Sequence, residues 1–308
     1  MKYELITILG PTAVGKTRVA ASLAYKFNGE IISADSRQVY KNMDIGTGKD
    51  YSDYFINGEQ IPFHLIDIAE PSEEFNLYRF RKEFDLAFEK IKGQNRIPFL
   101  VGGTGLYLSA ILKGYNLVDA DLNSDRFDQL MKLSNEELSN KLLQINPNQH
   151  NTTDLKIKER IVKAIIISEA EKDLSKIHRS KAVSSLVIGI SKNREEIKKN
   201  ITARLKARLN QGMIEEVETL IRTGIKKEKL EFFGLEYKFI SKYLNGDLNY
   251  NDMFQKLNSA IHSFAKRQMT WFRKMEKEGI KINWIEGPDI IAGEKIIESQ
   301  FIAKSSKK

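Results

Sequence analysis

The sequence predicts an α/β protein with a parallel sheet flanked by helices, a small all-helical insertion and a helical C-terminal region. In the first third of the chain, short apolar runs alternate with segments whose apolar residues recur at helical spacing. Such alternation favours parallel strands joined by helices. From about Val118 only the helical spacing continues, until one more β-rich run at residues 185–190. The chain is therefore expected to leave the sheet, form a helical insertion and return.

The expected strands and helices follow in order. Strands are predicted at residues 5–9, 30–34, 63–68 and 97–101, with a loop at residues 36–58 and a helix around residues 80–91. Short amphipathic helices fill the insertion. After the strand at 185–190, helices are predicted at 194–211, 214–222, 235–244 and 253–277, then a short strand at 282–285 and a disordered tail at 303–308. We place the core at residues 1–117 and 184–308 and the insertion at 118–183.

A glycine-rich motif, G-P-T-A-V-G-K-T, follows the first strand directly and opens the first helix. It fits G-x-x-x-x-G-K-[ST], the loop of P-loop NTPase-like proteins, whose backbone N–H groups surround a polyphosphate. Lys16 would supply a charge to the terminal phosphate, and Thr17 a hydroxyl to a magnesium ion. The motif leaves open which diphosphate or triphosphate is bound. Its residues are Gly10, Pro11, Thr12, Ala13, Val14, Gly15, Lys16 and Thr17.

Composition excludes cysteine-based sites and gives no sign of a membrane span. The chain has 308 residues, 41% of them hydrophobic, no cysteine, and no apolar run long enough to span a membrane. Thiolate zinc sites and disulfides are therefore excluded, and we expect a cytoplasmic protein with no membrane partner. Lys and Arg number 49 against 41 Asp and Glu, a net charge of +8. That charge suits a polyanionic partner such as nucleic acid, but it equally suits a Lys-rich soluble protein.

Four residues or motifs stand at carboxyl ends of predicted strands, where ligands of parallel sheets bind. They are Gly10, Asp35, Asp67 and Gly102. A carboxylate at position 35 could join a magnesium shell, act as a general base, or only cap backbone amides of the next loop. Asp67 competes for the metal role. His64, within its strand, is better explained as a hydrogen-bonded structural histidine.

Two further features carry weaker signals. The G-G-T-G turn at residues 102–105 resembles a phosphate loop, but it could equally be a tight strand-to-helix turn, in which Thr104 is the side chain able to bond a ligand. Arg204 and Arg208 lie four apart on one predicted helix. A guanidinium matches phosphate oxygens in a bidentate way, although most helical arginines are simply solvated.

Taken in order, five motifs closely resemble the tRNA dimethylallyltransferases, also called tRNA isopentenyltransferases. The resemblance covers about residues 5–273 and is dense outside the insertion. Arg208 departs from the family pattern, which usually has an apolar residue there, and residues 234–237 match loosely. The motifs are G-P-T-A-V-G-K-T, I-I-S-A-D-S-R-Q-V-Y-K-N-M-D-I-G-T-G-K, F-H-L-I-D, R-I-P-F-L-V-G-G-T-G-L-Y-L and A-K-R-Q-M-T-W-F-R.

The resemblance implies a prenyltransferase acting on tRNA. The family transfers a dimethylallyl group from dimethylallyl diphosphate to N6 of adenosine 37, in tRNAs that read codons beginning with U. The products are N6-dimethylallyladenosine and diphosphate. The implied partners are dimethylallyl diphosphate, the tRNA anticodon stem-loop and Mg²⁺, and we expect a monomer.

The resemblance also implies residue roles. The catalytic residues would be Asp35 as general base, Thr104 beside the reacting centre, and Arg204 neutralising the diphosphate. The loop of residues 10–17 would hold the diphosphate of the prenyl donor, with Thr17 at the metal. The tRNA-contacting residues would be Asp35, Ser36, Arg37, Gln38, Thr104, Arg160 and Lys163.

Three other functions compete. A relative that prenylates free adenine nucleotides would share the loop and Asp35 but would not need a helical insertion or a basic C-terminal region. A small-molecule kinase would use the same loop for ATP and would have no need of the A-K-R-Q-M-T-W-F-R helix. A non-catalytic RNA-binding protein would have no use for Lys16, Thr17 and Asp35 together.

Overall fold

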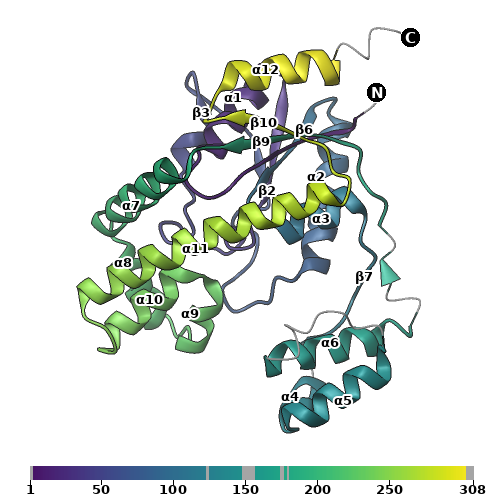
Figure 1. The fold of residues 1–308 in the computed structure, drawn as a ribbon, viewed down its shortest axis with the longest axis vertical. Coiled ribbons are helices and arrows are strands. Elements are labelled where there is room, and N and C mark those ends of the chain that lie inside the picture. The colour runs from purple at the N-terminus through teal and green to yellow at the C-terminus, as the bar shows by residue number, and fades with distance from the viewer. Residues whose placement is uncertain (1–2, 123–124, 148–156, 174–176, 179, 303–308) are drawn as a thin grey trace. The chain divides into compact units, whose positions relative to one another are not determined.

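The computed structural model describes residues 3–122, 125–147, 157–173, 177–178 and 180–302. They divide into two compact units, Met1–Lys113 with Ala182–Lys308, and Gly114–Lys181. The first unit contains a six-stranded parallel sheet in the order β10-β9-β1-β6-β2-β5 (Figure 1). Its strands are β1 (Leu5–Leu9), β2 (Gly29–Ala34), β5 (Phe63–His64), β6 (Ile97–Gly102), β9 (Ser185–Ser191) and β10 (Ile282–Glu286).

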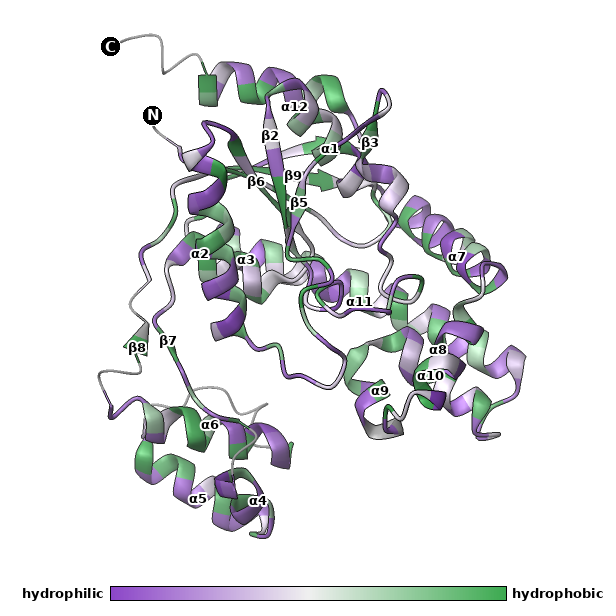
Figure 2. Cartoon of the chain, turned by 180° about the vertical axis from the view of Figure 1, so that it is seen from behind, coloured by the Kyte–Doolittle hydropathy of each residue, from purple (hydrophilic) through white to green (hydrophobic). Residues whose placement is uncertain are grey.

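Helices cover both faces of this sheet, so its strands are buried on both sides. Alternate residues of β1 serve the two faces: Leu5 and Leu9 belong to one hydrophobic cluster, Ile6 and Ile8 to the other. Figure 2 shows the hydrophobic residues of the central strands. One face carries α1 (Lys16–Lys26) and α12 (Ile290–Ile297), and the other α2 (Leu77–Gly93), α3 (Gly105–Lys113) and α11 (Tyr250–Lys277) (Figure 1).

The C-terminal region of the first unit is mainly helical, as predicted. Asn249 precedes the long helix α11, and its side chain caps the helix by accepting the N–H of Asp252 at 2.9 Å. The other helices are α7 (Arg194–Asn210), α8 (Met213–Arg222), α9 (Lys227–Phe233) and α10 (Leu235–Leu244), and a π-helical turn, η4 (Glu298–Ile302), follows α12. The predicted tail at 303–308 lies outside the described residues.

The second unit is a small helical body with its own hydrophobic cluster. Leu130, Leu138, Leu142 and Ile161 are each at most 1% exposed within it, and Figure 2 shows the hydrophobic residues of its helices. A capping box between Ser134 and Glu137 begins its second helix. Its elements are α4 (Asp125–Met131), α5 (Asn135–Ile145) and α6 (Lys158–Ala170), with a two-stranded ladder of β7 (Leu117–Val118) and β8 (Ile177–His178).

Two predictions for residues 36–68 were wrong. The strand predicted at 63–68 ends at His64, because Leu65 and Asp67 have positive φ angles of 64° and 56°, which break the extended conformation. The stretch predicted as a loop contains η1 (Tyr51–Tyr54) and β3 (Phe55–Ile56), which forms a hairpin with β4 (Glu59–Gln60) just after that stretch. The hairpin turns at Asn57 and Gly58, whose φ angles of 53° and 84° suit a two-residue turn of this kind.

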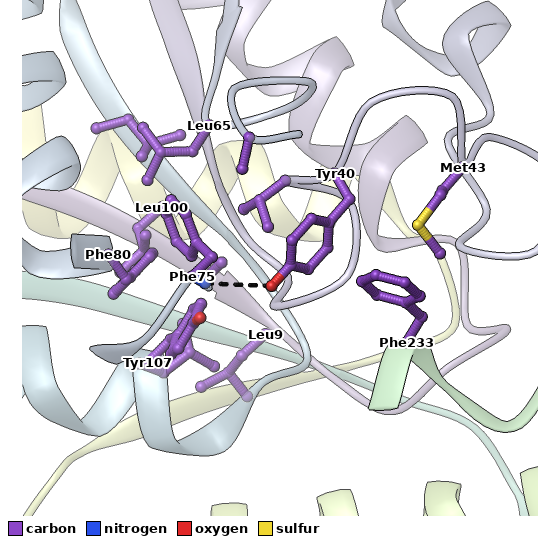
Figure 3. Close-up of a cluster of buried hydrophobic side chains, with 14 of the residues drawn as sticks. Leu9, Tyr40, Met43, Leu65, Phe75, Phe80, Leu100, Tyr107 and Phe233 are labelled. Atoms are coloured by element: carbon purple, nitrogen blue, oxygen red, sulfur yellow. Dashed lines mark hydrogen bonds between the residues drawn. The ribbon is translucent and has the colours of Figure 1, made fainter. Parts of the chain in front are cut away.

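A buried aromatic cluster anchors the chain that follows β2. The Tyr40 ring is fully buried, and its hydroxyl accepts the N–H of Phe75 at 3.2 Å (Figure 3). Phe233, at the end of α9, meets that ring edge-on with centroids 4.9 Å apart. Tyr40 is thereby fixed against Phe75, just before α2, and against the end of α9.

Candidate functional site

The glycine-rich loop leaves β1 and turns sharply into α1. Ala13 and Gly15 have positive φ angles of 65° and 88°, which curl the backbone. Among the residues that the structure describes, the N–H groups of Ala13, Val14 and Gly15 have no protein partner. These amides, together with the first turn of α1, form a site suited to an anion.

Three residues from distant helices hold this loop in place. Gln268 of α11 accepts the N–H of Thr12 at 2.9 Å and donates to the carbonyl of Gly103 at 3.0 Å. Asn200 of α7 donates to the carbonyl of Ala13 at 3.1 Å, and Arg204 of the same helix donates to the Thr12 hydroxyl. The Thr12 amide is therefore already used, so phosphate oxygens must bind to the other amides of the loop.

Lys16 and Arg204 give the loop a concentrated positive charge. The Lys16 ammonium donates to the carbonyl of Pro11 at 2.7 Å. Burial and then the charge of Arg204 lower the pKa of Lys16 to about 8. Burial and then Arg208 lower the pKa of Arg204 to about 10. An arriving polyanion would relieve both shifts, so this pair favours a diphosphate or triphosphate over a neutral ligand.

Asp35 lies at the carboxyl end of β2 with its two oxygens in different situations. Oδ1 accepts the N–H of Arg37 at 2.9 Å and of Gln38 at 3.4 Å, so it caps the following turn. Among the described residues, Oδ2 has no partner. The capping role and a chemical role are thus compatible, because one oxygen remains available as an acceptor.

Thr104 joins the turn after β6 to the turn after β2. Its hydroxyl accepts the N–H of Ser36 at 3.2 Å, and its own N–H donates to the carbonyl of Ala34 at 3.3 Å. The preceding Gly103 has no room for a side chain, since a Cβ there would lie 2.3 Å from Gln268 Nε2. The turn is glycine-rich because α11 packs directly against its backbone.

Two neighbouring pockets share Asp35, Thr12 and Arg204 in their walls. The first, about 310 Å³, contains the phosphate loop. The second, about 520 Å³, extends from Thr104 toward Phe233 and Trp271. The other residues common to both are Thr47, Gly103, Phe264 and Gln268.

The residues after Asp35 have distinct positions. Gln38 uses its side-chain amide within the protein, donating to the Gly48 carbonyl at 2.9 Å and bonding Ser33 at 3.2 Å. Ser36 and Arg37 line the second pocket. The Arg37 guanidinium lies 4.6 Å from the ring centroid of Phe232.

Several predicted residues lie away from the pockets. Asp67 bonds Lys49 and the Tyr51 hydroxyl, and it lines neither pocket, so its predicted place in the crevice was wrong. His64 bonds Glu30 at 2.7 Å, which fits the structural role expected of it.

Arg160 and Lys163 belong to α6 of the second unit and are described within that unit alone. Arg160 is exposed, and Lys163 pairs with Glu159 at 3.0 Å.

Gln268 and Glu236 are among the pocket residues that the sequence analysis missed. Gln268 is 7% exposed within the apolar stripe of α11, and a polar residue at such a position was a usable signal. Arg208, which the sequence analysis had weighed together with Arg204, lines the second pocket, pairs with Asp50 at 3.2 Å and packs on Gly48. Glu236, whose pKa is raised by burial, lines the second pocket. Nothing local in the sequence marks Glu236.

The first pocket offers hard oxygen donors for a cation. Thr17, Asp35, Asp50 and Asp53 all line it. No group of three or more acidic, histidine or cysteine residues suited to a metal occurs in the part of the chain that the structure describes. The donor set therefore fits Mg²⁺, which keeps waters and shares few protein ligands with substrate phosphates, better than a metal held by the protein alone. No described helix is long and apolar enough to cross a membrane.

Comparison with known proteins gives consistent matches along the whole chain. The family model of IPP transferase matches residues 38–275, and that of isopentenyl transferase matches residues 3–61. The tRNA dimethylallyltransferase 1 of Geotalea uraniireducens (strain Rf4) is 50% identical over 304 residues, covering 99% of this chain and 98% of the relative.

Solved structures agree with these matches. The tRNA isopentenylpyrophosphate transferase of Bacillus halodurans is 31% identical with a TM-score of 0.71, covering 98% of both chains. A eukaryotic dimethylallyltransferase acting on tRNA has the same fold, with a TM-score of 0.77 at 23% identity, over 98% of this chain and 80% of the other.

Proposed function

This chain belongs to the IPP transferase family, and we propose that it transfers a dimethylallyl group from dimethylallyl diphosphate to N6 of an adenosine in tRNA. Adenosine 37, in tRNAs that read codons beginning with U, is the proposed target. The products are N6-dimethylallyladenosine and diphosphate. One observation supports this most strongly: the phosphate pocket and the larger second pocket meet at Asp35 and Arg204.

The donor diphosphate belongs in the first pocket. The unpartnered amides of the loop, Lys16 and Arg204 would hold its oxygens as negative charge develops on it. Thr17 would hold Mg²⁺, which when bound supplies further charge neutralisation to the diphosphate. As the bond from the allylic carbon to the diphosphate oxygen breaks, this positive charge stabilises the leaving group.

The acceptor amine belongs at the junction of the two pockets. Asp35 Oδ2 is available to accept a hydrogen bond from N6, while Oδ1 stays fixed by the turn. As the bond from N6 to the allylic carbon forms, a proton on N6 passes to the Asp35 carboxylate. Thr104, tied to Ser36, keeps the two turns in register around the reacting atoms.

The RNA must present its adenosine outside the base stack. A base within a stacked anticodon loop cannot reach the junction of two pockets, so it is expected to flip out. The helical second unit, with Arg160 and Lys163 on α6, is proposed to contact tRNA phosphates. The proposed core and insertion then have separate tasks, prenyl transfer and RNA binding.

Each rival function leaves one feature of the structure unexplained. A kinase would leave the second pocket, with Phe233 and Trp271 in its wall, without a purpose. An enzyme for free adenine nucleotides would not need the separate helical unit.

One experiment separates these functions. The protein is incubated with Mg²⁺ and labelled dimethylallyl diphosphate, and offered either an anticodon stem-loop or AMP. We expect label on the RNA only. Label on AMP would favour the free-nucleotide enzyme, and label on neither would overturn the proposed function.

A further inference from the structure

An arginine and a phenylalanine are stacked at the edge of the second pocket. Arg37 lines that pocket, and its guanidinium lies 4.6 Å from the ring centroid of Phe232. Phe232 itself is 39% exposed, while its chain neighbours Glu231 and Phe233 line the pocket. The pair therefore lies at the rim, where the pocket meets solvent.

Both members of the pair are held by buried structure. The N–H of Arg37 donates to Asp35, which fixes the backbone of that turn. Phe232 precedes Phe233, whose ring is 1% exposed and packs edge-on against Tyr40 (Figure 3). The rings of Phe232 and Phe233 pack edge to face, with their centroids 5.8 Å apart. The stacked pair is thus preorganised on the core.

The pair has binding capacity that the protein does not use. Within the described residues, the Arg37 guanidinium donates no hydrogen bond to another residue. Burial lowers the pKa of Arg37, and nearby groups, Tyr40 and Asp35 first among them, offset this only in part. A partly exposed aromatic ring beside such a guanidinium offers apolar surface and several unused donors to a ligand.

We propose that Arg37 and Phe232 form a stacking platform for a nucleobase that flanks the target adenosine in the RNA. This inference rests on the proposed function. Flipping one base out of a stack leaves its neighbours exposed, and single-stranded bases are commonly stacked on aromatic rings and arginine planes. A second arginine near an aromatic ring, Arg267 over Phe264 at 5.9 Å, also lines this pocket, so its surroundings suit RNA.

The test combines protein variants with altered RNA. Phe232→Ala, Phe232→Trp and the wild type are compared on an intact stem-loop and on stem-loops made abasic at either neighbour of the target adenosine. Phe55→Ala is the matched control, because Phe55 is 47% exposed on the β3 hairpin and lines neither pocket. The measured quantities are KM for RNA, kcat and the melting temperature.

Phe232→Ala should raise KM for the intact stem-loop by about 5- to 100-fold, with kcat nearly unchanged. Phe232→Trp should keep most of the affinity, and Phe55→Ala should match the wild type. One abasic substitution should raise the KM of the wild type for RNA by a similar factor. It should raise the KM of Phe232→Ala little, because the stacking partner is already gone. Melting temperatures should show that the variants are folded.

Two results would overturn the inference. Either Phe232→Ala binds RNA as the wild type does, or the abasic substitutions raise KM for RNA equally in both proteins. Failure of the proposed function is distinguishable, because then the wild type would transfer no prenyl group to the intact stem-loop at all.

Discussion

The Thr12 backbone amide donates to Gln268 Oε1 at 2.9 Å, which ties the phosphate loop to a helix near the other end of the chain. The same side chain donates to the Gly103 carbonyl at 3.0 Å. Two turns at the carboxyl edge of the sheet are thus joined by one buried amide. The position of the loop relative to the second pocket depends on α11.

Replacing Gln268 by Ala should loosen both turns. The substitution leaves the Thr12 N–H and the Gly103 carbonyl without a partner, at a cost of about 1–3 kcal/mol in the free energy of unfolding. We expect KM for dimethylallyl diphosphate to rise more than KM for RNA. Gln255→Ala, an exposed change on the same helix, should alter stability by less than about 0.5 kcal/mol. Equal effects of the two variants in chemical denaturation would contradict this role.

Affinity for diphosphate should fall as pH rises above about 8. Lys16 has a pKa of about 8 in the free protein, lowered chiefly by burial. Below that pH the ammonium is present for the ligand; above it, binding must take up a proton, and the dissociation constant should rise by up to about tenfold per pH unit. Calorimetry at pH 8.5 in buffers of different ionisation enthalpy should detect this uptake.

The control for that titration is Lys16→Met. This variant should bind diphosphate weakly at every pH and should show no proton uptake between pH 7 and 9. Arg204 does not interfere in this window, since its pKa is about 10. An unchanged uptake in Lys16→Met would assign the titration to another group.

Asp35→Asn should stop transfer while leaving RNA binding intact. The amide oxygen of asparagine can still accept the N–H of Arg37, so the turn is kept, but the side chain can no longer take a proton. We expect kcat to fall by about 10²- to 10⁴-fold. Glu59→Gln is the control, because Glu59 is exposed and lines neither pocket, and it should keep the wild-type activity. Loss of stem-loop binding in Asp35→Asn would make Asp35 a structural residue.

Arg160 of the helical unit should contribute to RNA affinity through phosphate contact. For Arg160→Ala, the slope of log affinity against log salt should become shallower by about 0.7–0.9. Lys163→Ala removes a second positive charge from α6 and should make the slope shallower in the same way. Lys295→Ala removes the same charge from α12 and serves as the control. Identical slopes for all three variants would show that α6 makes no contact with the RNA phosphates.

The sheet and the phosphate loop were predictable because their signals are local. Short apolar runs marked β1, β2, β6, β9 and β10 to within one residue at each end. The strand predicted at 63–68 failed because periodicity does not register the positive φ angles of Leu65 and Asp67. The missed hairpin did have a signal, since Asn57-Gly58 is a favoured two-residue turn.

The site was only partly predictable, because some of its contacts join residues far apart in the chain. The motifs identified the phosphate loop, Asp35 and Thr104, which the fold brings to one pair of pockets. Gln268 could have been noticed as a polar residue in an apolar stripe. The positions of Arg208 and Glu236 depend on how α7 and α10 pack, which no short stretch of sequence specifies.

The most direct test of the central claim is nucleoside analysis of RNA after reaction with labelled dimethylallyl diphosphate. Wild-type protein with Mg²⁺ and an anticodon stem-loop should yield labelled N6-dimethylallyladenosine from the position of adenosine 37, with one diphosphate released for each group transferred. A stem-loop carrying guanosine at that position should yield none. Label found at other positions, or in added AMP in place of RNA, would contradict the account.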